Sequence, residues 1–140
     1  MSKEKKRIPI GLENFEQIIK DNYYYVDKTG LISELLRNGG MVNLFTRPRR
    51  FGKTLNMSML EHFFSIEGDK SIFEGLKISK DTELTEEYMG RYPVIFVSLK
   101  GINAATYDRA FDFAVQIMKD IAAAMQFLLE SEKISEYDKA

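Results

Sequence analysis

Apolar residues recur every three or four positions along two segments, and this spacing predicts two amphipathic helices. The first predicted helix runs from Lys53 to about Ser65, and its apolar stripe consists of Leu55, Met59, Leu60 and Phe63. The second covers about residues 107–130, and its apolar positions are Phe111, Val115, Met118, Ile121, Met125 and Leu128. Both stripes are typical of helices that bury one face.

Two shorter helices are predicted near the N-terminus. The segment Asn14-Phe-Glu-Gln17 resembles a capping box, with Asn14 as the N-cap of a short helix. After the extended aromatic run 23–26, Asp27 can cap a helix over about residues 28–37. Asn38-Gly-Gly40 ends that helix, because Asn and Gly tolerate the left-handed backbone of a helix C-terminus.

Two short, largely apolar runs, Met41–Thr46 and Val94–Leu99, predict buried strands. Strand, helix, strand and helix then follow one another with crossovers long enough for parallel pairing. We therefore expect an α/β fold with a parallel sheet covered by helices. Residues 68–92 are polar and are expected to be irregular, with Ile72, Phe73 and Leu76 anchoring them.

Composition supports a folded domain and excludes several kinds of chemistry. The chain has 140 residues, of which 44% are hydrophobic, so wholesale disorder is excluded. It has no Cys and a single His, His62, which rules out disulfides, thiolate chemistry and a multi-His metal site. No apolar stretch approaches the roughly 18 residues of a membrane span, and no secretory signal is apparent. We expect a cytoplasmic location and no membrane partner.

Charge is distributed unevenly along the chain. Residues 1–54 carry 11 Lys+Arg and 6 Asp+Glu, whereas residues 55–140 have a net charge of -6. Residues 1–7 are interpreted as a solvated basic tail. The second basic cluster, Arg47, Arg49, Arg50 and Lys53, lies in an otherwise apolar context and indicates an anionic partner.

This basic cluster contains a candidate phosphate-binding loop. Gly52-Lys-Thr54 follows a predicted strand and opens a predicted helix, which is the context such a loop requires. Gly52 permits close approach of a phosphate, Lys53 can reach its oxygens, and Thr54 offers a hydroxyl to Mg²⁺. The complete pattern G-x-x-x-x-G-K-[ST] requires Gly where this chain has Arg47, and Pro48 removes one N–H. A basic turn that caps a helix is the alternative interpretation.

Several blocks of sequence resemble the predicted AAA-ATPase-like family of bacteria and archaea over about residues 8–125. They are Ile10-Gly11, Asn14-Phe15, Tyr24-Tyr-Val-Asp-Lys-Thr29, Arg47-Pro-Arg-Arg-Phe-Gly-Lys-Thr-Leu55, Met59-Leu60, Phe63-Phe64 and Tyr92-Pro-Val-Ile-Phe96. In that family the Arg in place of the loop Gly belongs to the motif. The resemblance implies a P-loop NTPase of the ASCE type, a three-layer sandwich with a parallel sheet, often joined to a PD-(D/E)XK nuclease-like domain.

The resemblance implies that ATP and Mg²⁺ bind at the loop. The candidate cofactor-binding residues are Arg47, Arg49, Arg50, Phe51, Gly52, Lys53, Thr54 and Leu55, and Thr54 is also the candidate metal ligand. The block Tyr25–Thr29 is expected either to lie near the base or to serve packing, with Asp27 as a helix cap and the tyrosines in the core.

Hydrolysis by such a domain also needs an acidic strand, the Walker B strand, to hold Mg²⁺. The run 94–99 ends in Ser98, Leu99 and Lys100, so this strand is expected to lie outside the chain, and we expect no hydrolysis by this chain alone. We therefore interpret residues 8–130 as the N-terminal portion of the domain and residues 131–140 as a polar tail.

Two other functions remain open. The basic loop Arg47–Lys53 could bind nucleic acid, either by itself or within a larger parent protein. Alternatively, the chain could be an interaction domain without a ligand that forms a homodimer through its last helix.

Overall fold

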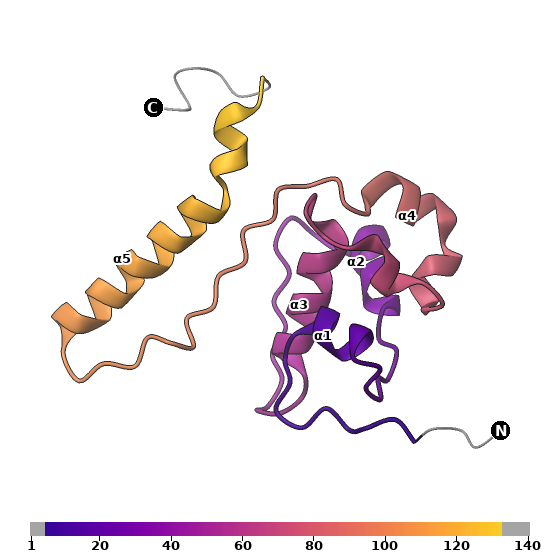
Figure 1. Cartoon of the computed structure of the whole chain (residues 1–140), viewed down its shortest axis with the longest axis horizontal. Coiled ribbons are helices and arrows are strands. Elements are labelled where there is room, and N and C mark those ends of the chain that lie inside the picture. The colour runs from indigo at the N-terminus through magenta and orange to yellow at the C-terminus, as the bar shows by residue number, and fades with distance from the viewer. Residues whose placement is uncertain (1–4, 133–140) are drawn as a thin grey trace. The chain divides into compact units, whose positions relative to one another are not determined.

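The computed structural model describes residues 5–132 and divides the chain into two compact units, one extending to Val94 and the other beginning at Ile95 (Figure 1). Most of the polar tail predicted at 131–140, and residues 1–4 of the basic tail, lie outside the described residues. None of the described helices combines the length and the apolar character needed to cross a membrane.

Three α-helices of the first unit correspond to the predicted ones. α1 spans Phe15–Lys20, and the Asn14 side chain accepts a hydrogen bond from the Gln17 N–H at 2.8 Å, which confirms the predicted cap. α2 spans Gly30–Asn38 and begins two residues later than expected. α3 spans Lys53–Phe64, one residue short of the predicted end.

Aromatic and aliphatic side chains from several elements form the core of the first unit. Phe63 of α3 and Phe15 of α1 both contact Phe73, with ring centroids 5.4 Å and 5.1 Å apart. Ile32 of α2 is also fully buried. The other buried residues of this cluster are Met59, Ile72 and Ile78. The predicted stripe of α3 is confirmed, because Leu55 and Leu60 pack against this cluster.

The polar segment 68–92 is more ordered than the sequence analysis predicts. It contains the 3-10 helices Lys70–Phe73 (η1) and Lys77–Lys80 (η2), followed by α4 at Thr82–Tyr88. The Asp69 side chain accepts a hydrogen bond from the Ser71 N–H at 3.0 Å, and Asp81 accepts one from the Leu84 N–H at 3.4 Å. These carboxylates cap the short helices. The predicted anchors Ile72 and Phe73 are buried.

The expected α/β fold is wrong: among residues 5–132 the structure has no sheet. Met41–Thr46 and Val94–Leu99 are not strands, and the one isolated β-bridge described joins Ser65 to Tyr92. The parallel-sheet sandwich is therefore not the architecture of this chain. The reason is physical: an apolar run becomes a strand only when a neighbouring strand satisfies its backbone groups. Val42 and Leu44 are instead 89% and 86% exposed.

The second unit consists of an irregular segment followed by helix. α5 spans Tyr107–Ala124, and a 3-10 helix, η3, continues it over Gln126–Glu130. The predicted helix at about 107–130 thus starts at the expected residue but changes type near its end. No residue of α5 is buried.

Candidate functional site: the basic loop at the start of α3

Residues 47–52 form a tight loop that leads into α3. Two of them, Arg50 and Gly52, have left-handed backbones, with φ of 68° and 72°. Gly52 is the N-cap residue of α3 and provides no side-chain cap. The next residue, Lys53, is right-handed and helical, and this change of hand makes successive N–H groups point to one side. A Cβ at position 52 would meet no atom within 4 Å, so space beside the loop is open.

Lys53 holds the loop in a closed shape. Its ammonium Nζ donates hydrogen bonds to the backbone carbonyls of Arg47 at 2.6 Å and Pro48 at 2.9 Å. Hydrogen bonds from a charged donor are stronger than neutral ones. The lysine therefore fixes the start of the loop against the first turn of α3.

The loop is electropositive. The Arg47 guanidinium donates to the Thr46 carbonyl at 3.0 Å. Arg49 and Arg50 are exposed. Within residues 5–132 none of these arginines forms a salt bridge. Three unneutralised guanidiniums beside one ammonium attract an anion.

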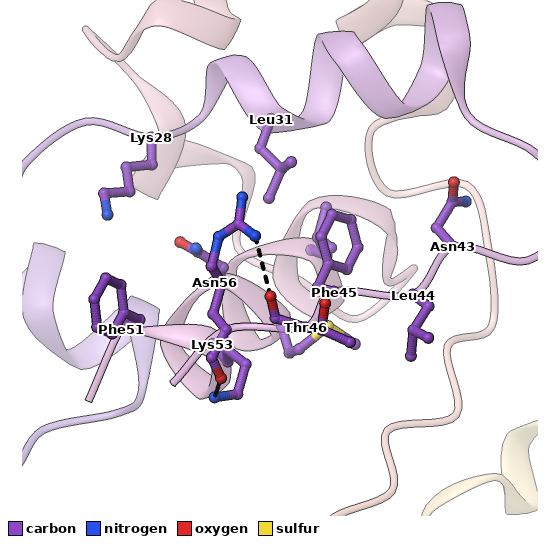
Figure 2. Close-up of a pocket in the computed structure, with 12 residues that line it drawn as sticks. Lys28, Leu31, Asn43, Leu44, Phe45, Thr46, Phe51, Lys53 and Asn56 are labelled. Atoms are coloured by element: carbon purple, nitrogen blue, oxygen red, sulfur yellow. Dashed lines mark hydrogen bonds between the residues drawn. The ribbon is translucent and has the colours of Figure 1, made fainter. Parts of the chain in front are cut away.

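A pocket of about 490 Å³ adjoins the loop (Figure 2). Of the predicted site residues, Arg47, Phe51 and Lys53 line it. Leu31 of α2 and Lys28 lie on the opposite side of the pocket from Lys53 in Figure 2. The other lining residues are Asn43, Leu44, Phe45, Thr46, Asn56, Met57 and Leu60. The volume falls in the range of roughly 300–1,000 Å³ that is usual for small-ligand sites.

The other predicted site residues lie around the loop but do not line the pocket. Thr54 is half-buried in the first turn of α3. Leu55 packs against the hydrophobic core, so it supports the helix. The lining residues Asn43, Asn56 and Met57 were missed by the sequence analysis. Asn56 and Met57 lie one turn beyond Lys53 and Thr54, and this helical spacing is the signal that could have identified them.

The block Tyr25–Thr29 mainly serves packing. The Tyr25 ring packs edge-on against Phe15, with centroids 5.3 Å apart, and burial raises the pKa of its hydroxyl. The Asp27 carboxylate accepts hydrogen bonds from the Thr29 N–H at 2.9 Å, the Thr29 hydroxyl at 2.6 Å and the Lys77 N–H at 2.7 Å. Asp27 thereby connects the start of α2 to η2.

Residues 9–139 match the model of a family described as Predicted AAA-ATPase. The chain belongs to this family. Among curated proteins, it is similar to an uncharacterized protein in the vnfD 5' region of Azotobacter chroococcum mcd 1, with 38% identity over 98 residues. That match covers 69% of this chain but 18% of the relative, so the chain spans less than a fifth of the protein it matches. No solved structure matches the chain significantly.

Among the described residues, no cluster of three or more His, Asp or Glu side chains could hold a metal ion. His62 serves structure: its Nδ1 lies 2.8 Å from the Ser58 carbonyl oxygen, and its Nε2 lies 3.4 Å from a carboxylate oxygen of Glu16. The contact with Glu16 connects α3 to α1.

Proposed function

We propose that the basic loop binds the phosphate groups of a nucleotide, with ATP as the ligand that fits the family. The observation that carries this proposal is the position of Lys53, whose ammonium closes the loop through the carbonyls of Arg47 and Pro48. A lysine held in this way is already at the mouth of an electropositive loop. The Lys53 ammonium can donate to phosphate oxygens in place of the carbonyl oxygens with little movement, because both kinds of oxygen accept hydrogen bonds.

The start of α3 would complete the phosphate site. The first N–H groups of a helix have no partner within the helix, and the helix dipole places positive potential there. Gly52 has no side chain to occupy that end, and the space beside it is open. The N–H groups of residues 53–55 would therefore donate to phosphate oxygens.

Mg²⁺ would arrive with the nucleotide. Mg²⁺ in nucleotide sites commonly takes few protein ligands and is held mainly by phosphate oxygens and water. The Thr54 hydroxyl, in the first turn of α3, is the protein group that we propose for it. Bound Mg²⁺ would neutralise charge on the phosphates.

The nucleoside would extend into the adjoining pocket. Leu31, Phe45 and Phe51 give the pocket apolar and aromatic walls, and Asn43 and Asn56 add hydrogen-bonding groups. A few polar groups in a mostly apolar pocket are typical of a site that orients a ligand.

Isothermal titration calorimetry with Mg·ATP tests this function. Replacing Lys53 by alanine is expected to weaken binding about tenfold or more, because an ammonium–phosphate contact is lost. Lys80→Ala is the matched control, since Lys80 is an exposed lysine in η2, away from the loop. The melting temperature of each free variant shows whether the loop itself has been disrupted. Absence of binding by the wild type, or equal affinity of the Lys53 variant, would contradict the proposal.

Nucleic-acid binding is the second candidate, and the exposure of Arg49 and Arg50 favours it. These side chains do not line the pocket and are free to contact a phosphate backbone. In that case the affinity for duplex DNA falls steeply as the salt concentration rises. The double variant Arg49→Ala/Arg50→Ala is then expected to reduce the slope of log K against log salt concentration by about two. The nucleotide proposal predicts a different result: Mg·ATP still binds at salt concentrations at which DNA no longer binds.

A further inference from the structure

We propose that α5 is an interaction surface for a second copy of this chain, which packs against it as an antiparallel helix. The proposal starts from the exposure of apolar residues on this helix. Phe111 is 55% exposed and Met118 is 63% exposed. Such exposure of large apolar side chains along one stripe indicates a surface that binds a protein partner.

Apolar residues of α5, two of them exposed and large, form a regular seam. Phe111, Val115, Met118, Ala122 and Met125 follow one another at alternating spacings of four and three residues. This alternation keeps the residues on one face over two heptads, as in the seam of a coiled coil. A neighbouring row, Ala110, Ala114, Ile117 and Ile121, is already half-buried. Val115 and Met125 of the seam are half-buried too, and its exposed residues are Phe111, Met118 and Ala122.

Charge complementarity identifies the partner as a second copy. Asp112 and Lys119 both lie beside the seam, two turns apart and on the same edge. If two α5 helices pack antiparallel with Phe111 opposite Ala122 and Val115 opposite Met118, Asp112 of each copy faces Lys119 of the other. The two-fold axis produces this ion pair twice. Within residues 5–132 neither Asp112 nor Lys119 forms a salt bridge inside the chain.

The opposite edge of the seam fits the same packing. Ala114 and Ile121 would face each other between the two copies, which adds an apolar contact. A parallel arrangement would instead place the edge that carries Asp112 and Lys119 beside the partner's edge that carries Ala114 and Ile121, so neither charge would meet an opposite charge. The sequence of α5 is thus self-complementary in the antiparallel orientation only.

Sedimentation equilibrium of the full 140-residue chain across a wide concentration range tests the proposal. The wild type is expected to dimerise. Asp112→Lys and Lys119→Asp, each made alone, are expected to raise the dimer dissociation constant about tenfold, because two attractions become two repulsions. The double variant Asp112→Lys/Lys119→Asp restores both pairs and should return the constant to near the wild-type value.

Asp120→Lys is the matched control, because it makes the same charge change on the outer face of α5, where Asp120 contacts Gln116 at 2.7 Å. It should leave dimerisation unchanged. Circular dichroism confirms that each variant keeps its helix. A monomeric wild type, or a double variant that stays as weak as the single ones, would overturn the proposal.

Discussion

Replacing Phe63 by alanine is expected to lower the free energy of unfolding by about 3–5 kcal/mol, as large-to-small changes of buried aromatic residues do. The Phe63 side chain is completely buried. Its ring lies edge-on to Phe64 and Phe73, with centroids 5.1 Å and 5.4 Å away. Alanine would leave a cavity between α3 and η1 that neighbouring side chains can fill only in part. Urea denaturation followed by tyrosine fluorescence measures the change.

Phe51→Ala provides the control for this result. Phe51 is 59% exposed, so the same substitution removes few packed contacts. We expect a loss below about 1 kcal/mol for this variant. Similar losses for the two variants would mean that the aromatic cluster is not the core of the first unit.

Removal of the Asp27 side chain is the second large effect that we expect. Asp27→Ala eliminates the three hydrogen bonds that the carboxylate accepts from Thr29 and Lys77. It also leaves the Thr29 hydroxyl, in a completely buried residue, without its acceptor. Hydrogen bonds to charged groups are individually worth about 1.5–3 kcal/mol, and they are not additive. We therefore expect a loss of about 2–4 kcal/mol, measured by urea denaturation.

Glu34→Ala is the control for general charge removal, since Glu34 is an exposed acid on α2.

Thr29→Val removes the hydroxyl that donates to Asp27 and accepts from the Ile78 N–H at 3.1 Å. Because Asp27 and Thr29 share one network, the losses in the double variant should be smaller than the sum of the single ones. Additive losses would contradict the network.

The contribution of Asp27 is also expected to depend on pH. Burial raises the pKa of this carboxyl, but the hydrogen bonds from Thr29 and Lys77 outweigh burial and hold the pKa below its ordinary value. The folded-state pKa is therefore lower than the unfolded one, which is about 3.9. The stabilisation is fully present above the unfolded pKa and is lost as pH falls through the folded pKa.

Comparison of the wild type with Asp27→Asn isolates this pH effect. Asp69 titrates in the same acidic range, because hydrogen bonds from Ser71 and Lys20 lower its pKa to about 2. The difference in unfolding free energy between the two proteins removes that shared contribution. This difference should shrink as the pH falls below about 4. A difference that does not vary with pH would show that the Asp27 charge has no role.

α1 and α3 could be predicted because local signals specify them, whereas the N-cap of α2 is Thr29 and not the predicted Asp27. Asn14 caps α1 as its side chain suggests, and the spacing of Met59 and Phe63 identifies the buried face of α3. The capped helices of segment 70–88 were missed, although Asp69 and Asp81 are recognisable caps. The polar composition of this segment, which is typical of an irregular loop, masks these two local signals.

The strands could not be predicted correctly from the apolar runs. An apolar run shows a preference for burial or pairing, but it does not supply the partner. In residues 41–46, the Asn43 side chain instead bonds back to Gly40, accepting from its N–H at 3.2 Å and donating to its carbonyl at 2.9 Å. Local hydrogen bonds of this kind compete with a β-ladder.

The candidate site was predicted in part. The sequence predicted a helix that begins at Lys53, and this is confirmed. The close approach of a phosphate at Gly52 stays a prediction. The contacts of Lys53 with the carbonyls of Arg47 and Pro48 depend on how the whole loop folds. The lining residues from α2 and from segment 43–46 depend on tertiary packing, which no short motif encodes.

The central claim, that the basic loop binds nucleotide phosphates, is tested most directly by a ¹⁵N–¹H NMR titration of the chain with Mg·ATP. The account predicts that the amide signals of Gly52, Lys53, Thr54 and Leu55 shift progressively and saturate. The amide signals of core residues around Phe73 should shift little. Spectra that do not change, or shifts confined to residues distant from the loop, would contradict the claim.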